Sequence, residues 1–142
     1  MKILWYLFLF FSTSSIAQFP QTPKALKYST KDGLSFGIVN SIVQDNNGFM
    51  WVATDDGLNR FDGISFRIFR HDSEEKFSLP GNYINTVFKD SRGQLWITSR
   101  KGLLKFDASQ EHFYPQSLYN GQNMDEDISS ISEAKNGNLW IS

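Results

Sequence analysis

Two short segments, residues 45–48 (DNNG) and 90–93 (DSRG), offer oxygen ligands of the kind that bind calcium. An EF-hand loop needs further oxygen ligands at its fifth position and a glutamate at its twelfth. Here Phe49 takes the fifth position and Asp56 the twelfth, so the spacing does not fit. The segments instead predict hairpin turns, in which the aspartate accepts turn N–H groups and the glycine takes a positive φ. We expect no metal site.

Three tryptophans, Trp51, Trp96 and Trp140, could each provide a ring on which a sugar stacks. Each of the three lies within a short strand-like segment, between apolar neighbours. A wide ring in that setting fills the gap between two packed sheets. The pattern therefore favours core positions over a carbohydrate platform.

The remaining titratable residues form no catalytic pattern. Asp55-Asp56 and Arg100-Lys101 stand in related loops with opposite charge, which is not how a duplicated active site would look. His71 has no second histidine or cysteine at metal-ligand spacing, and neither has His112. No Ser-His-Asp set, glycine-rich phosphate loop or carboxylate pair stands out. We expect no catalytic residue and no cofactor within this chain.

The candidate residues belong to a unit that occurs three times. The pattern D-x-x-G-x-x-W is followed by G-L-x-x-F-D, and the tryptophans are 45 and 44 residues apart. In the third copy Ala134 replaces the aspartate. The structural repeat positions are Asp45, Gly48, Trp51, Gly57 and Asp62, then Asp90, Gly93, Trp96, Gly102 and Asp107, then Gly137 and Trp140. A period of 40–50 residues is typical of propellers and solenoids.

Each complete unit divides into four short strands bounded by turn residues. The expected strands are residues 39–44, 49–54, 58–61 and 65–70, then 84–89, 94–99, 103–106 and 112–115. The second strand is apolar on both faces, which indicates burial on both sides. These features predict an all-β fold of β-propeller blades, each with four antiparallel strands in about 45 residues. The propeller is incomplete in this chain.

The first 17 residues predict a cleaved signal peptide. Lys2 precedes the apolar run Ile3–Phe11, and Ser15 and Ala17 suit a signal-peptidase site. The run is about half of what a membrane span needs. The further boundaries expected are an N-terminal segment at 18–37 with a possible outer strand, repeat 1 at 38–72, a linker at 73–82, repeat 2 at 83–116 and a truncated repeat 3 at 127–142.

Composition limits the classes of function. The formal net charge is −1 and cysteine is absent, so no basic nucleic-acid face, disulfide or thiolate site is expected. With 40% hydrophobic residues the chain can build a core. After signal cleavage we expect an exported protein without membrane contact.

The unit NSIVQDNNGFMWVATDDGLNRFDG resembles the two-component regulator propeller repeat. That family implies a periplasmic sensor of a Bacteroidetes-type hybrid two-component histidine kinase, in which many repeats form propellers ahead of a membrane helix, a kinase and a DNA-binding domain. Such sensors respond to oligosaccharides and control polysaccharide-utilisation genes. The resemblance therefore implies an oligosaccharide ligand at unknown residues, with the remaining blades and the downstream signalling domains as partners.

Two other classes stay open, a secreted lyase or hydrolase acting on polysaccharide and a structural interaction propeller. The chain stops partway along the strand that contains Trp140, so we expect it to be part of a longer protein. On that view Leu139 and Ile141 would lack packing partners at one open side, and the strand of Met50 and Trp51 would lack a neighbour at the other.

Overall fold

The computed structural model describes residues 25–117 and 126–142, so the predicted signal peptide at 1–17 lies outside the described residues. The strands are β1 (Val39–Gln44), β2 (Met50–Thr54), β3 (Gly57–Phe61), β4 (Phe66–Phe69), β5 (Ile84–Lys89), β6 (Leu95–Ser99), β7 (Gly102–Asp107), β8 (His112–Pro115), β9 (Ile131–Glu133) and β10 (Leu139–Ile141). One short 3-10 helix, η1 (Thr30–Asp32), precedes them. The all-β prediction is confirmed.

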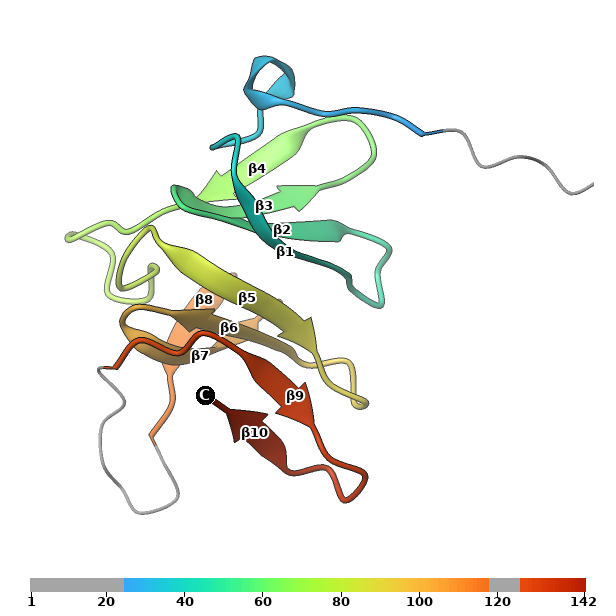
Figure 1. Ribbon diagram of the computed structural model, residues 1–142. Coiled ribbons are helices and arrows are strands. Elements are labelled where there is room, and N and C mark those ends of the chain that lie inside the picture. The colour runs from blue at the N-terminus through green and yellow to red at the C-terminus, as the bar shows by residue number, and fades with distance from the viewer. Residues whose placement is uncertain (1–24, 118–125) are drawn as a thin grey trace, which may run out of the picture.

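The strands form three separate antiparallel sheets that follow one another like blades (Figure 1). Blade 1 has the order β1-β2-β3-β4 and blade 2 the order β5-β6-β7-β8, so each is a simple meander. Blade 3 consists of β9 and β10 in the described residues. The first strands β1, β5 and β9 lie side by side along one side of the stack. The expected strands of the two complete units match the observed ones to within one residue at each end.

Alternation along each strand gives every blade two faces. We call the face that packs on the following blade the forward face, and the opposite one the rear face. Trp51 and Phe69 lie on the forward face of blade 1, where they meet Leu95, Ile97 and Phe106 on the rear face of blade 2. Because Trp51, Val52, Ala53 and Thr54 are all buried, β2 is covered on both faces, as its apolar sequence predicts.

A second, smaller core joins blade 2 to blade 3. Leu103, Ile128 and Ile131 are buried there, and Leu139 and Ile141 pack against them with Phe88 and Trp96 of blade 2. The expectation that Leu139 and Ile141 lack partners is therefore wrong, because both point back toward blade 2. Trp51 faces blade 2 and is only 1% exposed, but within the described residues no further sheet packs on the rear face of blade 1, where Met50 lies, as expected for that strand.

Trp140 is the exception among the three tryptophans. Its side chain is 68% exposed, whereas Trp51 is buried and Trp96 is half-buried. Its strand neighbours point back to blade 2, so the alternation of the strand turns Trp140 to the forward face of blade 3. The prediction of a core position is thus wrong for Trp140 in this structure, because within the described residues no sheet follows blade 3.

The N-terminal segment also differs from expectation. Residues 25–29 form no strand, and Tyr28 packs instead on the rings of Phe61 and Phe66 in blade 1. Leu34 is buried, as is Leu79 at the corresponding point before blade 2. The segment is held by a fully buried Asn59, whose side-chain oxygen accepts the backbone N–H of Ser35 at 2.9 Å.

The contrast between Trp51 and Trp140 gives a matched pair of substitutions. We predict that Trp51→Ala lowers the free energy of unfolding by about 3–5 kcal/mol, because it empties a filled site between two sheets. Trp140→Ala in the same chain should change it by less than about 0.5 kcal/mol, since the ring is exposed. Urea titration followed by circular dichroism measures both. Equal losses for the two variants would contradict the assignment of Trp51 to the core.

Candidate functional site

The turn between β1 and β2 ties the backbone to the core tryptophan through one carboxylate. Oδ1 of Asp45 accepts the backbone N–H groups of Asn47 and Phe49, at 2.9 and 3.0 Å. Oδ2 accepts the indole N–H of Trp51 at 2.8 Å. A calcium ion would have to displace all three donors, so the side chain has a structural role. The repeated motif therefore fixes the ring orientation as well as the turn.

Blade 2 repeats this arrangement. Oδ2 of Asp90 accepts the indole N–H of Trp96 at 2.9 Å, and Oδ1 accepts the N–H groups of Arg92 and Gln94. Burial by itself would raise the pKa of Asp90, but the bond from Trp96, the two backbone bonds and the charge of Arg92 outweigh it. The pKa therefore lies below its ordinary value of 3.8. The hydrogen bonds thus favour the ionised carboxylate in the folded chain.

The third turn has the same backbone hydrogen bonds as the other two, although it lacks the aspartate. The N–H of Ala134 donates to the carbonyl of Asn138 at 2.8 Å, and the N–H of Gly137 donates to the carbonyl of Ala134. The side-chain oxygen of Asn136 accepts the N–H of Asn138, which corresponds to the N–H of Gln94 in blade 2. Ala134 offers no acceptor for the indole of Trp140. The hairpin turn and the tryptophan bond are therefore separable functions of the motif.

Successive turns pack on one another at the same end of the blades. The side chain of Asn46 lies over Gly93, where an added Cβ would come within 2.0 Å of its Nδ2. Gly93 also has a φ of +84°, so the position requires glycine on two grounds. The side-chain oxygen of Asn46 accepts a bond from Lys89, and one blade later Ser91 donates two bonds of 2.7 Å to Glu133. Each turn thus binds the end of the next blade's first strand.

Polar side chains in the first strands form a second link between blades. Asn40 Nδ2 donates to the carbonyl of Ile84 at 2.8 Å, and Asn85 Nδ2 donates to the carbonyl of Ile128 at 2.7 Å. The hydroxyl of Ser41 donates to the carbonyl of Val87. A register shift at each asparagine marks a β-bulge, which re-aims a side chain out of the ladder. We call these hydrogen bonds from the first strand of one blade to the next blade the interblade latch.

We call the interface between two successive blades a seam, and the one between blades 1 and 2 the first seam. An ion pair lies at the outer edge of the first seam. Glu111, in the turn between β7 and β8, has a φ of +58° and reaches back to blade 1. There it binds Arg60 at 3.0 Å and also Arg67. The guanidinium of Arg60 lies over the rings of Phe49 and Trp51, so the pair covers the edge of the apolar core. No feature of the repeat pattern predicts this contact.

The other repeat positions lie at strand ends, next to turns. Gly57 and Gly102 have φ values of +114° and +103°, and a Cβ on Gly57 would lie 2.6 Å from the carbonyl oxygen of Phe69. Asp62 accepts the backbone N–H groups of Ser65 and Ile64, which lower its pKa. Asp107 is held in the same way by the side chain and the backbone of Ser109, and its pKa is lowered too.

The charged loop positions have different local roles in the two blades. Asp55 accepts a bond from Asn40, and Asp56 pairs with Arg70 at 2.9 Å. In the related loop of blade 2, the guanidinium of Arg100 lies 3.7 Å from the ring centre of Tyr83. The structure therefore does not bring these charges together as one site.

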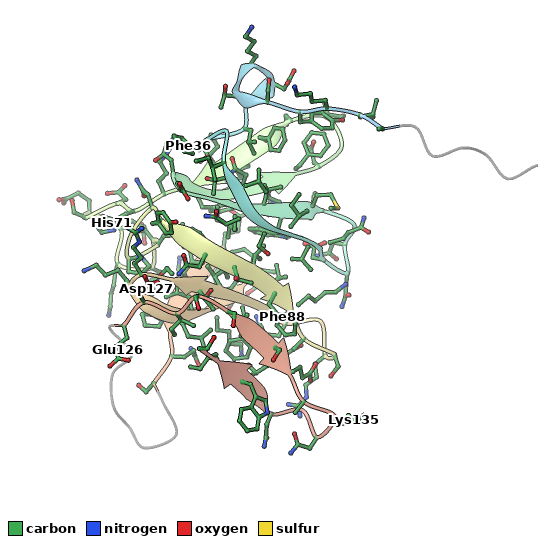
Figure 2. The ribbon with its side chains drawn as sticks, in the orientation of Figure 1. Phe36, His71, Phe88, Glu126, Asp127 and Lys135 are labelled. Atoms are coloured by element: carbon green, nitrogen blue, oxygen red, sulfur yellow. The ribbon has the colours of Figure 1, made fainter. Side chains whose placement is uncertain are left out.

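The two histidines contact different residues. Nδ1 of His71 donates to the carbonyl of Leu79, and the ring of His112 stacks on Phe77. Figure 2 places His71 by the connection from β4 to β5, on the opposite side of the molecule from Lys135. The described residues include no group of three or more side chains placed to hold a metal ion.

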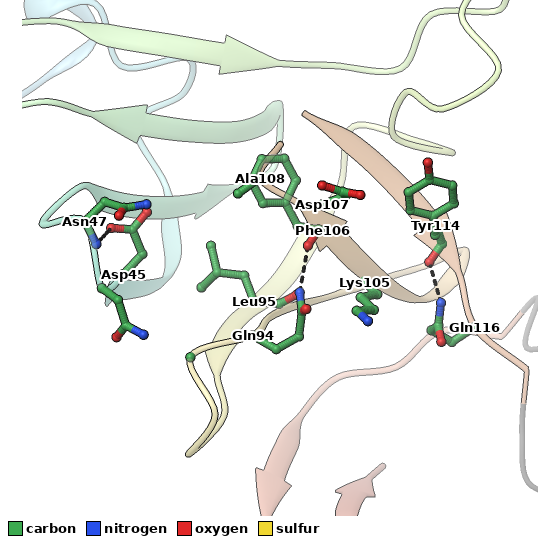
Figure 3. A pocket seen from close by; sticks show the side chains of 12 residues that line it. Asp45, Asn47, Gln94, Leu95, Lys105, Phe106, Asp107, Ala108, Tyr114 and Gln116 are labelled. Atoms are coloured by element: carbon green, nitrogen blue, oxygen red, sulfur yellow. Dashed lines mark hydrogen bonds between the residues drawn. The ribbon is translucent and has the colours of Figure 1, made fainter. Parts of the chain in front are cut away.

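A cavity of about 600 Å³ opens at the turn end of blades 1 and 2 (Figure 3). One wall is polar and comes from the β1–β2 turn at 45–47, facing Asp107 and Ala108 at the end of β7. The amide of Gln94 bridges the floor by donating to the carbonyl of Phe106 at 2.6 Å. This part of the cavity is a cleft between two turns, and we call it the turn cleft.

The other wall of the cavity consists of Lys105, Tyr114 and Gln116. Lys105 lies opposite both Trp96 and Tyr114 in the sheet. The side chains of Lys105, Trp96 and Tyr114 therefore belong to the forward face of blade 2. The corresponding positions of blade 1, Arg60 and Arg67, are bound by Glu111 of the next blade. The wall with Lys105 and Tyr114 therefore occupies the surface that, in blade 1, contacts the next blade. The turn cleft is the better candidate for a ligand site.

The fold and the seams define a class: consecutive blades of a β-propeller built from a repeat that supplies its own interblade contacts. Comparison with known proteins shows which repeat this is. The two-component regulator propeller model matches residues 33–56 and 78–101, which contain the two Asp-Trp turns. Both complete blades therefore carry the two-component regulator propeller repeat.

The relatives are signalling proteins. Two extracellular domains of hybrid two-component systems from B. thetaiotaomicron are similar in structure. One has 30% identity and a TM-score of 0.71 over 82% of this chain, and the other has 26% identity and a TM-score of 0.61 over 73%. A histidine kinase of Formosa agariphila is 50% identical over 48 residues. The chain spans 17% and 15% of the two extracellular domains and 4% of the kinase.

The Asp90–Trp96 bond predicts both a loss of stability and a change in its pH dependence. In Asp90→Asn, one amide oxygen can serve either the indole or the turn N–H groups but not both. We expect the free energy of unfolding to fall by about 1–2 kcal/mol at pH 7. This loss is near the lower end of the range for hydrogen bonds to charged groups, because Asp90 is half-buried. Urea titrations at several pH values measure both effects.

The direction of the pH effect follows from the lowered pKa. The unfolded chain takes up the proton first, so the stabilisation is complete above about pH 5 and is lost as the pH falls below 3.8 toward the folded pKa. The difference between wild type and Asp90→Asn should therefore shrink in acid. A constant difference down to pH 3 would contradict the role given to the carboxylate. Ala134→Asp is the reciprocal variant, and it adds the missing acceptor beside Trp140.

Proposed function

We propose that this chain is a ligand-sensing propeller segment of a periplasmic two-component sensor that responds to oligosaccharides and controls polysaccharide-utilisation genes. The observation that carries the sensor role is the similarity to extracellular domains of hybrid two-component systems, at 30% identity over 82% of the chain. In such a protein, binding outside the membrane changes the state of a kinase inside it. The described residues contain no helix able to cross a membrane.

The turn cleft supports a polar ligand such as an oligosaccharide. Asn46 and Asn47 line it with carboxamides, Asp107 adds a carboxylate and Gln94 a further amide. Donors and acceptors of this kind match the hydroxyl groups of sugars, and a few such groups in a cleft fix the orientation of a ligand. One turn of the cleft is held by the bond between Asp45 and Trp51, and the other by the bonds from Ser109 to Asp107, so the walls are preorganised.

A sensing role needs no chemistry in this segment, and we infer that the segment is non-catalytic. The carboxylates of Asp45 and Asp62 are bound by turn N–H groups, and Asp56 is paired with an arginine. A secreted lyase or hydrolase would require a free acid or base beside the substrate. Turnover of any bound oligosaccharide by the purified protein would favour that second class.

We also propose the boundaries read from the sequence: a signal peptide at 1–17, repeat 1 at 38–72, a linker at 73–82, repeat 2 at 83–116 and repeat 3 from 127. If the signal is cleaved, mass spectrometry of the exported protein should find an N-terminus at Gln18. Replacing Ala17 with a bulky residue such as Phe should block cleavage there. An intact Met1 on the exported wild type would contradict the proposal.

Ligand binding can be tested at the turn cleft in the full-length protein. A panel of neutral and uronic-acid oligosaccharides is titrated by calorimetry into the wild type, Asn47→Ala and Arg92→Ala. Asn47 lines the cleft, and Arg92 occupies the same position of the next turn outside it. We expect Asn47→Ala to weaken binding about tenfold, the equivalent of about 1.4 kcal/mol, and Arg92→Ala to leave it unchanged. If no member of the panel binds, or both variants bind as the wild type does, the assigned site is wrong.

A further inference from the structure

Asp107 gives the turn cleft a carboxylate with one oxygen free. Its Oδ1 accepts the backbone N–H and the hydroxyl of Ser109, at 2.8 and 2.7 Å, and the N–H of Gln110 at 3.4 Å. Its Oδ2 accepts no hydrogen bond from the described residues, and none of their basic side chains forms an ion pair with it. The bonds from Ser109 favour the ionised form, so the pKa of Asp107 lies below its ordinary value of 3.8. The side chain is therefore charged at neutral pH.

Gln94 adds a second acceptor on the floor of the cleft. Its Nε2 donates to the carbonyl of Phe106 at 2.6 Å (Figure 3) and to that of Leu95 at 3.0 Å. These two bonds use both amide hydrogens and fix the orientation of the group. Its Oε1 accepts no hydrogen bond within the part of the chain that the structure describes. A carbonyl oxygen in a fixed position is thus left for a ligand.

The facing turn supplies one neutral amide. The side chain of Asn47 is exposed, and its amide offers both donors and an acceptor. Asp45 also lines the cavity, but the turn and Trp51 already use both of its oxygens. The basic side chain among the described lining residues is Lys105, which belongs to the other wall. The turn cleft therefore has more free acceptors than donors, and its charge is negative.

Such a cleft selects by charge and by the type of hydrogen bond. A sugar hydroxyl can donate to Asp107 and to Gln94, and an ammonium group can donate while also carrying the opposite charge. A carboxylate or sulfate group can only accept. It would leave the acceptors of the cleft without partners and would be repelled by Asp107.

We propose that the turn cleft takes neutral or amine-bearing sugars and rejects acidic ones, and that Asp107 determines this selectivity. The proposal rests on the proposed function, because it names the class of oligosaccharide for the same cleft. Asp62, the corresponding aspartate of blade 1, provides a matched control. It holds its turn through Ile64 and Ser65 in the same way, but it does not line the cavity.

The test uses ligands that differ at one carbon. Each neutral oligosaccharide of the panel is titrated into the full-length protein beside two derivatives, one with its C6 groups oxidised to carboxylates and one with C6 amino groups. We expect the acidic derivative to bind at least about tenfold more weakly than the neutral parent, and the amine at least as tightly as the parent. Raising the salt concentration should narrow the difference, because salt screens the repulsion from Asp107.

The aspartate variants assign the selectivity to one side chain. Asp107→Asn keeps an oxygen for the bonds from Ser109 and removes the charge. It should reduce the preference for the neutral parent over the acid to about threefold or less, since the mismatch at Gln94 remains. Asp62→Asn loses the same charge from the same kind of turn and should keep the preference of the wild type.

Three results would overturn the proposal. The first is an acidic derivative that binds the wild type as tightly as its neutral parent, a comparison that needs no substitution. The second is the same preference in Asp107→Asn and Asp62→Asn. The third is tight binding of acids that Lys105→Gln abolishes, which would place the ligand on the other wall. If nothing in the panel binds, the oligosaccharide-sensing function is wrong and the selectivity falls with it, whereas binding without the preference contradicts the selectivity alone.

Discussion

The seams of this structure depend on the orientation of one indole ring in each blade. A tryptophan on a strand could take several rotamers, but the carboxylate of Asp45 fixes the ring of Trp51 through its N–H while holding the preceding turn. The ring then stacks on Phe69 and reaches Phe106 in the next blade. A local bond between residues six apart thereby sets the geometry of a contact between residues more than fifty apart. This coupling explains why turn and tryptophan recur together.

Blade packing then proceeds by a small set of repeated contacts. The apolar centre of a seam is enclosed by the latch asparagine on the side of the first strands and by a turn-to-strand contact at the turn end. In the first seam Glu111 adds an ion pair at the outer edge. Among the described residues, only blade 2 has contacts of this kind on both faces, while Ile42 on blade 1 and Trp140 on blade 3 are open. Stability is therefore shared between neighbours, as in other repeat proteins.

Much of the fold follows from the sequence because strands, turns and period are local properties. The strand bounds of both complete blades and the burial of β2 are predicted by alternation and turn residues alone. The exposure of Trp140 was not predictable from its strand pattern, because burial of this position requires a following sheet, and the described residues contain none. The bond from Asn40 to Ile84 was missed since the pattern does not say where a bulge aims a side chain. Glu111 gave no signal at all, because its contact joins positions that are not repeated.

The same division between repeated and unrepeated residues bears on recognition. Asp45, Gly93 and Trp51 are committed to turns and seams, and their hydrogen-bonding groups or their space are already used. Residues that differ from blade to blade at the same turn position, such as Asn47 and Arg92, keep side chains at the surface. A propeller of this kind can therefore change its ligand without changing its seams, provided that substitutions fall between the fixed positions. If the proposed ligand binds at this end, its specificity comes from the combination of turns that several blades bring together, since each turn alone offers only one or two polar side chains outside the fixed positions.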